Sequence, residues 1–476
     1  MRIYFILSLL PAAALCLSGC ATHLDETRQM RSYWESGDYK AAALSAAEMA
    51  EGAEDSADEL VWLLDEGSAS RAAGQISQSI KAFDKAYDLV QKFDSEPEIN
   101  LAAESKALLT NLSYLPYTGY NYDRIMLGTY QALNCMETGD IDGAAVMLKR
   151  VENFQRDAER KNAERISYGM ESAARTSGST VDGKRVYDAN RAMSDVRFQN
   201  ALAGVYGSGA SVFKGSRGNY VNPFAYWLDG VYFMACAKDS ADRQRSVDSF
   251  RILSSMVENK YVAEDLRQAG KVAHGEKMPA TTYVIYETGC APLRDQVRID
   301  IPVFLATNDV PYVGVNFPRL RYVGKYSPNL SVSAGGKSYP PLIVADMDKI
   351  VAEEFNNELP LVIAKTLLSA GTKAALQYGL QESVRAASNG DSALLLAAMI
   401  VGSIYQVSMN DADLRTWSTL PKQIKISRMP TPKDGKIFID GREVKVDVSA
   451  RANIVCVNKP SAFSQISIRC FAIGKH

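Results

Sequence analysis

The pattern of apolar and polar positions divides the chain into two halves. In the first half, small-residue turns alternate with Ala-rich stretches at helical spacing. From about residue 280 the pattern changes to short β-branched or aromatic runs of alternating polarity, separated by Pro and Gly. We therefore expect an α+β fold with a helical domain over residues 31–275 and a mixed α/β domain over residues 280–476.

Four segments of the first half share one pattern. The copies are residues 32–42, 73–87 and 130–148, with a weaker one at 226–250. Gly37 and Gly74, at the turns of the first two, are 37 residues apart, close to the roughly 34-residue period of tetratricopeptide repeats. A single helix pair cannot bury its own apolar face, so we expect the pairs to stack into a tetratricopeptide-like solenoid with a concave side. The alternative is a set of helical hairpins that only form a core.

The second half is predicted to hold strands in residues 281–344, helices in 346–407 and strands again in 423–473. Asp434-Gly435 and Asp440-Gly441 are typical of hairpin turns. Residues 393–405 are the most apolar stretch after the N-terminus, but thirteen residues are too few to span a bilayer. A buried helix is the favoured interpretation, and an interfacial segment beneath a lipid anchor is the alternative.

The N-terminus predicts export and lipidation. Arg2 precedes an apolar run of fifteen residues, 3–17, which is typical of a signal peptide and short of the roughly 20 needed for a membrane-spanning helix. The run ends in Leu17-Ser18-Gly19-Cys20, which resembles a bacterial lipobox. The resemblance implies removal of residues 1–19, acylation of Cys20 (palmitate-type chains) and a lipidated tether over residues 20–30. An ordinary secretory signal is the alternative.

The residue after Cys20 bears on location. Ala21 stands where lipoproteins kept in the inner membrane commonly carry Asp, so we expect the periplasmic face of the outer membrane, with membrane lipid as one partner.

Charge and composition bear on the class of protein. The formal net charge of −2 gives no basic surface for binding nucleic acid. With 47% apolar and 23% charged residues, the rest of the chain is typical of a globular protein.

Beyond Cys16 and Cys20 the chain has five cysteines, an odd number that leaves at least one thiol unpaired. Cys456 and Cys470 are the best candidates for a disulfide because they lie in two apolar stretches symmetric about Phe463, where a hairpin would bring them together. Buried free thiols are the alternative.

Three stretches carry a family resemblance. They are residues 119–130, residues 412–421, and residues 283–287 with the following 289–292. Together they resemble an uncharacterised family of bacterial outer-membrane lipoproteins with a tetratricopeptide-like N-terminal half. The resemblance implies architecture and an envelope location, and no established activity.

Residues 412–421 suggest a mechanical role. Asp413 and Arg415 are placed to flank a helix end, Trp417 offers a large area to bury, and Pro421 would stop the helix before the next strand. We interpret these four residues as a clasp that joins the apolar helix to the terminal sheet. The alternative is a polar site in which Asp413 and Arg415 recognise a ligand.

Catalytic signatures are sparse. His274 is the one histidine expected in the folded body, since His23 falls in the predicted tether and His476 ends the chain. The chain has no Gly-x-Ser-x-Gly, His-Glu-x-x-His or Cys-x-x-Cys motif, so we expect no catalytic residue, metal or cofactor. Carboxylate pairs such as Asp346 with Asp348, or Asp411 with Asp413, leave a peptidoglycan-cleaving hydrolase as a less favoured alternative.

The favoured function is a non-enzymatic adaptor that holds other envelope proteins near the outer membrane through its helical-repeat surface. Aromatic and arginine side chains are the usual energetic anchors of such surfaces. The candidates are Trp34, Tyr39, Trp62, Tyr122, Arg124, Tyr130 and Trp227. Most of the aromatic ones are expected to be core, because an aromatic residue at a repeat position usually packs against its neighbour. A further alternative is that the strand-rich half binds cell wall or a secreted polymer, or belongs to an export component. It predicts an exposed aromatic patch on that half and none on the solenoid.

Overall fold

The computed structural model describes residues 23–95, 115–176, 180–181, 184–185, 189–207, 221–302, 312–387 and 412–475. The predicted signal peptide, Cys20 and the apolar stretch 393–405 lie outside this part of the chain. Within it, none of the helices combines the length and the apolar character needed to cross a bilayer.

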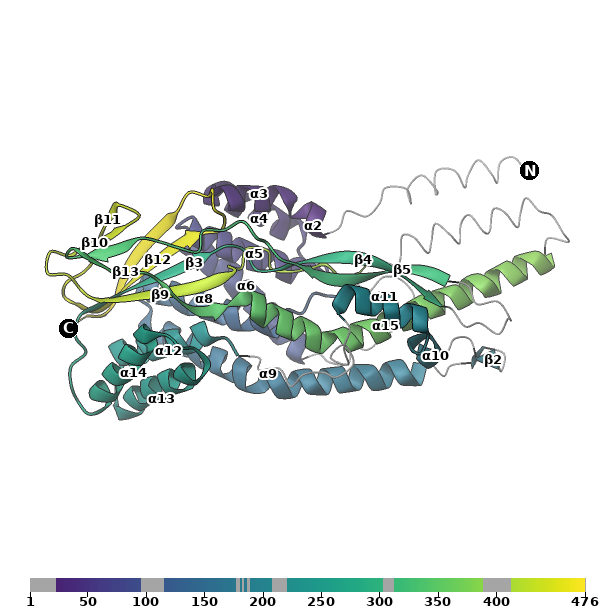
Figure 1. Cartoon of the computed structure of the whole chain (residues 1–476), viewed down its shortest axis with the longest axis horizontal. Coiled ribbons are helices and arrows are strands. Elements are labelled where there is room, and N and C mark those ends of the chain that lie inside the picture. Colours follow the sequence, from purple (N-terminus) through teal and green to yellow (C-terminus); the bar gives the residue numbers. More distant parts are fainter. Residues whose placement is uncertain are drawn as a thin grey trace.

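The fold is mixed α/β (Figure 1). Its helices are α2 His23–Glu26, α3 Arg28–Ser36, α4 Tyr39–Gly52, α5 Glu59–Ala72, α6 Ile76–Ser95, α8 Asn121–Thr138, α9 Ile141–Thr176, α10 Ala189–Met193, α11 Val196–Tyr206, α12 Pro223–Cys236, α13 Ser240–Met256, α14 Lys260–Ala273 and α15 Met347–Ala387. Its strands are β1 Thr180–Val181, β2 Lys184–Arg185, β3 Thr281–Thr288, β4 Leu293–Pro302, β5 Tyr312–Arg321, β6 Val332–Ala334, β7 Lys337–Ser338, β8 Leu342–Asp346, β9 Gln423–Pro430, β10 Lys436–Ile439, β11 Arg442–Lys445, β12 Ala450–Lys459 and β13 Ser467–Lys475.

A five-stranded sheet of order β13-β12-β3-β9-β8 organises the molecule. The central strand β3 runs parallel to β12 and antiparallel to β9, and every residue of β3 is buried. Tyr283 and Ile285 face the core shared with the helices, whereas Val284 and Tyr286 face the core formed with the small sheet β11-β10-β6-β7. Side chains alternate across a strand, so one strand serves both cores.

The helix pairs expected from the repeat pattern are present. Gly37, Gly74 and Gly139 stand at the turns of α3/α4, α5/α6 and α8/α9, each with a positive φ that glycine tolerates best. The fourth pair is α12/α13. The pairs do not form a core of their own, because a single apolar cluster runs from Met30 through all four pairs to Ile473 on β13.

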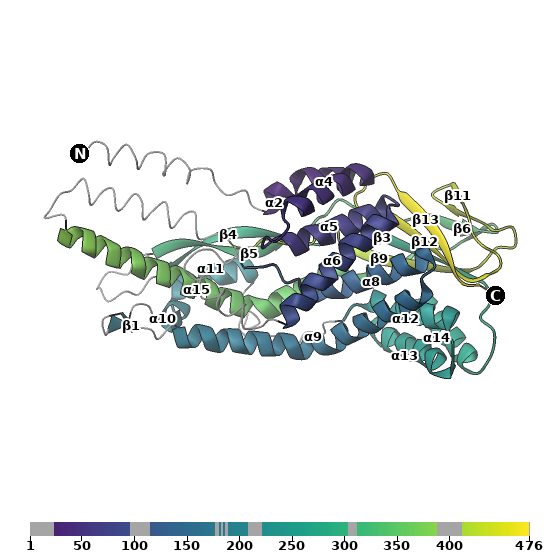
Figure 2. The same ribbon diagram turned by 180° about the vertical axis from the view of Figure 1, so that it is seen from behind.

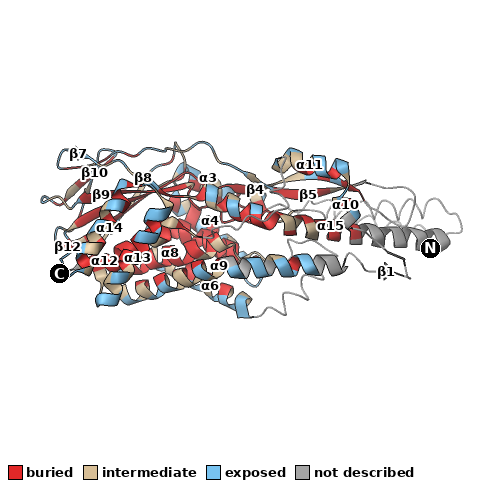
Figure 3. Ribbon diagram, turned by 60° about the horizontal axis from the view of Figure 1, so that its bottom comes forward, coloured by how far each residue is buried: buried red, intermediate tan, exposed pale blue. Residues whose placement is uncertain are grey.

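Sequence and structure therefore differ over the domain boundary. The expected break at residues 275–280 separates helices from strands along the chain, but both share one core. Figure 3 shows buried residues concentrated where the helices meet the sheet. The reason is that the helix pairs and one face of the sheet bury their apolar side chains together in a single cluster.

A second body extends from one end of this core (Figures 1 and 2). The long hairpin β4–β5 packs with α11 and α15 around an apolar cluster that includes Phe198, Ile299, Phe317 and Phe355. The long helix α9 runs alongside α15, where Leu361 lies against Gly169. The charged run 149–165 is part of this helix, as its i, i+4 pattern suggested.

The predicted tether is largely a folded element. α2 begins at His23, whose side chain is only 7% exposed, and Thr27 and Met30 are buried. The His23 ring lies against the Trp62 ring at 5.4 Å. The prediction of a tether over residues 20–30 is therefore wrong from residue 23 onward, because Met30 and Trp34 bury apolar area that a free arm would expose.

The predicted C-terminal hairpin forms as β12–β13, but the expected disulfide does not fit its register. Cys456 pairs with Arg469 and Cys470 pairs with Val455, so the two thiols are one position out of register. A shift of one residue places side chains on opposite sheet faces. Cys456 is buried, Cys470 is exposed, and both are free thiols.

Candidate partner-binding surface

The aromatic residues proposed as partner anchors are instead part of the core. The buried members are Trp34, Tyr39, Trp62, Tyr122, Tyr130 and Trp227. Tyr39 Oη donates to the backbone oxygens of Asn458 (2.9 Å) and Gln465 (2.7 Å), and Tyr130 Oη donates to the Glu287 carboxylate at 2.7 Å. These side chains join the helices to the sheet, which is why they are unavailable to a partner.

Arg124 is also engaged within the chain. Its Nη1 donates to the Asp94 carboxylate at 2.8 Å, and its Nε and Nη2 both donate to the Thr118 carbonyl. The residue therefore ties α8 to α6 and to the segment before α8. It is a structural residue rather than a partner contact in this conformation.

Residues 412–421 fasten the N-terminal helices to the segment that leads into β9; the predicted link to the apolar helix falls outside the described residues. The described residues 412–421 are non-helical, and the residues just before Ala412 lie outside the described part of the chain. Arg415 chelates the Asp413 carboxylate (2.9 and 2.7 Å) and donates to the carbonyls of Ala57 (3.1 Å) and Leu115 (2.8 Å). Burial alone would raise the pKa of Asp413, but the guanidinium outweighs it and lowers that pKa below its usual range.

The Trp417 part of the clasp fastens the segment to α5. The Trp417 indole N–H donates to Ser68 Oγ at 3.0 Å, and its ring meets Phe83 and Tyr130 edge to face. Asp65 lies one helical turn earlier and is fully buried. Burial raises the pKa of Asp65 to about 6, although hydrogen bonds from Thr419 and Ser418 oppose the shift. The clasp thus joins the N-terminal helices to the strand β9, and the apolar stretch 393–405 lies outside the described residues.

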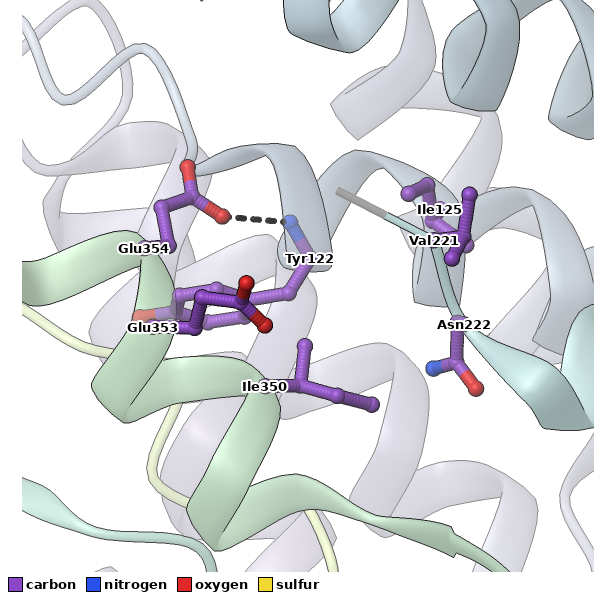
Figure 4. Close-up of a pocket in the computed structure, with 7 residues that line it drawn as sticks. All are labelled: Tyr122, Ile125, Val221, Asn222, Ile350, Glu353 and Glu354. Atoms are coloured by element: carbon purple, nitrogen blue, oxygen red, sulfur yellow. Dashed lines mark hydrogen bonds between the residues drawn. The ribbon is translucent and has the colours of Figure 1, made fainter. Parts of the chain in front are cut away.

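A second buried polar cluster links α15 to α8 (Figure 4). Glu354 accepts hydrogen bonds from the backbone N–H groups of Asn121 (2.7 Å) and Tyr122 (3.2 Å), the first two residues of α8. It therefore caps α8 from another helix. The adjoining cavity, lined also by Ile125 and Asn222, has a volume of about 10 Å³, which holds one water molecule at most.

A third cluster connects α5 and α8 to the β12–β13 hairpin. Arg71 donates to Asn134 at 2.6 Å and to Cys456 Sγ at 3.4 Å, and Glu137 pairs with both Arg71 and Arg469. Burial raises the pKa of the Cys456 thiol, which disfavours the nucleophilic thiolate. The cavity here is again about 10 Å³, so this cluster offers no room for a substrate in this conformation.

Of the remaining candidates for chemistry, Asp411 lies outside the described residues, and His274 and Asp348 are engaged locally. His274 is exposed, and its ring Nδ1 lies 2.7 Å from the Gly270 carbonyl in its own helix. Asp348 is paired with Lys422. In the described part of the chain, no group of His, Cys, Asp and Glu side chains is arranged to hold a metal ion.

The described surface does carry one open groove of about 560 Å³, between α4 and α6. Its floor is the C-terminal end of α5, and its walls carry Leu44, 63% exposed, and the lysines Lys40 and Lys81. The full lining is Lys40, Ala43, Leu44, Ala47, Ser70, Gly74, Gln75, Ile76, Ser77, Gln78 and Lys81. Since this lining includes two cations and no carboxylate, the groove favours a segment that is both apolar and acidic.

The β12–β13 loop presents Phe463, 85% exposed. The loop is held by bonds among its own serines, with Ser461 Oγ accepting from the N–H groups of Phe463 (3.1 Å) and Ser464 (3.0 Å). Ser461 Oγ also donates to the Glu35 carbonyl at 2.7 Å. These bonds fix the backbone of the loop, and a large apolar side chain that is exposed to water is a typical partner anchor.

The loop and the groove are joined through shared neighbours. Gln465 packs directly on Gly37, where an added Cβ would lie 2.5 Å from the Gln465 nitrogen, and Gly37 is three residues from Lys40. Ser467 Oγ donates to the carbonyl of Ala72 at 2.7 Å, two residues before Gly74 in the groove. We call the groove and Phe463 together the groove surface.

Sequence reasoning missed the groove surface. Phe463 lies at the centre of the predicted hairpin, between Pro460, Ser461 and Ser464. An aromatic residue among turn-forming residues was the one local sign that this side chain would be exposed. The groove itself had no local signal, because α4 and α6 become neighbours across α5 only in the fold.

Comparison of this chain with protein-family models, with curated proteins and with solved structures finds no match.

Proposed function

We propose that this protein is a lipid-anchored adaptor of the bacterial envelope, held by an acylated Cys20 at the periplasmic face of the outer membrane. In this proposal the first two helix pairs act as a tetratricopeptide-like binding unit, and the groove surface binds a segment of another envelope protein. The observation that carries the proposal is the open groove lined by Leu44 and two lysines, together with the exposed Phe463 on a loop that packs on the α3/α4 turn.

The favoured occupant is an amphipathic helix with acidic residues on one flank. Lys40 to Ala47 covers two turns of α4, or about 10 Å, which matches roughly the diameter of one helix crossing it or two turns of a helix lying along it. Leu44 would bury against the apolar face of that helix, and Lys40 and Lys81 would pair with its carboxylates. Such helix-in-groove binding uses anchors at i, i+3 and i+4.

The buried clusters also support an adaptor. Most polar atoms of Asp65, Glu354 and Arg71 form hydrogen bonds that join different elements of the fold. The cavities next to Glu354 and Arg71 each have a volume of about 10 Å³. These groups therefore stabilise the shape of the surface rather than meeting a substrate.

The binding test uses site-specific photo-crosslinking in cells that produce the full chain. A photoreactive residue replaces Leu44 or Phe463, with Ile252 on α13, which is 40% exposed, as the matched control. We expect Leu44 and Phe463 to label the same acidic, amphipathic segment of one envelope protein, and Ile252 not to label it. The double variant Lys40→Glu/Lys81→Glu should reduce that adduct at least tenfold.

Two outcomes would contradict the binding proposal: adducts at Leu44 that match those at Ile252, or adducts unaffected by the charge reversal. The anchor is tested separately by Cys20→Ala. We expect this variant to leave the membrane fraction or to accumulate with residues 1–19 still attached, and unchanged fractionation would contradict acylation.

A further inference from the structure

The start of the folded body lies very close in sequence to the proposed lipid-bearing residue. Only Ala21 and Thr22 stand between Cys20 and His23, the first residue of α2. A chain spans at most about 3.6 Å per residue, so Cys20 cannot lie more than roughly 11 Å from His23.

α2 is fixed to the body on several sides. The His23 ring contacts Trp62 and its Nε2 lies 3.2 Å from the Thr416 carbonyl. Arg31 Nη2 donates back to the Leu24 carbonyl at 2.8 Å, and Arg31 Nε donates to Thr27 Oγ1 at 3.1 Å. Unwinding α2 and α3 to lengthen the arm would expose buried side chains, so the arm stays short.

We propose that the face formed by α2 and the first turns of α3, called the α2–α3 face, lies directly against the lipid headgroups, and that the protein has no flexible spacer from the membrane. The inference rests on the proposed acylation of Cys20. The outward side chains of this face are polar: Arg28 is 76% exposed, and Asp25, Gln29 and Ser32 are exposed with it. Neither of these two helices exposes a large apolar side chain, so the face suits headgroups rather than the hydrocarbon layer.

This placement leaves the groove surface open. α5 contacts His23 through Trp62 near its N-terminal end, whereas Ser70, near its other end, lies in the groove. Eight residues of helix separate the two, about 12 Å. Glu35 and Ser36, which hold the Phe463 loop, are likewise at the far end of α3 from His23. A partner can therefore reach the groove surface while the α2–α3 face stays on the membrane.

The test measures distance from the bilayer in acylated protein. The full chain is purified from membranes, acylation of Cys20 is verified by mass, and the protein is inserted into phosphatidylethanolamine–phosphatidylglycerol vesicles carrying a headgroup-linked quencher. A fluorescent amino acid replaces Gln29 on α3, or Ser254 on α13 as the control. α13 lies on the other side of the molecule from α3 (Figure 1), and both positions are exposed.

We expect quenching at Gln29 to exceed that at Ser254 at least threefold. Insertion of 21 Gly/Ser residues between Thr22 and His23, which adds a mean span of about 25 Å, should remove the difference. Equal quenching at the two positions, or a difference that the insertion leaves unchanged, would overturn the headgroup placement while the anchor itself stands. A mass showing no acyl chain on Cys20 would overturn the anchor, and this inference with it.

Discussion

The Asp65 carboxylate accepts two hydrogen bonds from Thr419, one from its backbone N–H at 2.9 Å and one from its hydroxyl at 2.7 Å. The two residues are 354 positions apart, and both are buried. This contact joins the second helix pair to the clasp and, through the clasp, to β9. The contact also fixes α5, whose C-terminal end forms the floor of the groove.

Asp65→Ala should destabilise the protein strongly. The change leaves the Thr419 N–H, the Thr419 hydroxyl and the Ser418 hydroxyl without their acceptor in a buried site, at a cost of about 3 kcal/mol in the free energy of unfolding. Asp65→Asn keeps one acceptor oxygen and should cost about half as much. Urea unfolding measures both, with the exposed Asp88→Ala on α6 as the control, expected within about 0.5 kcal/mol of the parent. A parent-like Asp65→Ala would refute the role of this contact.

Arg415→Lys should be costly despite keeping the charge. Lysine cannot chelate Asp413 in two bonds while also reaching the carbonyls of Ala57 and Leu115, so buried acceptors lose their donors. We expect a loss of about 2–4 kcal/mol in the free energy of unfolding. The matched control is Arg251→Lys, since Arg251 forms an exposed ion pair with Asp248 on α13. This substitution should change the free energy of unfolding little. If the two variants are equally stable, the Arg415 contacts contribute no more to the free energy of unfolding than a surface ion pair does.

His23 should make stability depend on pH. Burial lowers its pKa from 6.5 to about 4, so between these values the unfolded chain binds the proton that the folded chain excludes. The contribution of neutral His23 to the free energy of unfolding is therefore present above pH 6.5, and it is lost as the pH falls from 6.5 toward 4. The expected loss between pH 7.5 and pH 5 is about 2 kcal/mol.

The measurement for His23 is the free energy of unfolding of the parent and of His23→Gln at both pH values, so that the titration of other groups cancels in the difference. His274→Gln, at the exposed end of α14, is the control. The difference between the parent and His23→Gln should shrink or reverse on acidification. A constant difference would mean that His23 is solvated, and that α2 is the flexible arm the sequence suggested.

Glu354 predicts the opposite trend with pH. Burial, with the nearby Glu358 carboxylate, raises the pKa of Glu354, so the folded chain holds a proton that the unfolded chain has released. Its contribution is present at acidic pH and is lost as the pH rises through the raised pKa. Glu354→Gln should therefore gain stability relative to the parent at alkaline pH, by about 1 kcal/mol or more between pH 5 and pH 9.

Glu354→Ala separates the charge from the cap. It leaves the N–H groups of Asn121 and Tyr122 without an acceptor, so it should be less stable than Glu354→Gln at every pH. Unfolding curves at pH 5, 7 and 9 test the pair. Parallel pH profiles for the parent and Glu354→Gln would show that the carboxyl titrates normally.

Several local features were predictable because they depend on residues that are near in sequence. Gly37, Gly74 and Gly139 mark the turns of helix pairs since each supplies a positive φ. Asp440 and Gly441 both adopt positive φ in the turn between β10 and β11, as the Asp-Gly pattern indicates. The β12–β13 hairpin was likewise evident from its two apolar runs.

The amino-acid sequence by itself determined the helix pairs of the first half and the change to strands near residue 280, because backbone preferences and the spacing of apolar residues act over a few positions. Only the tertiary structure decided that Trp34 and Tyr39 face the sheet, that His23 is buried, and that Cys456 lies opposite Arg469. These outcomes depend on register and on which surfaces bury the most area together. A one-residue shift of register moves a side chain to the other face without changing any local preference, so the local pattern alone does not specify them.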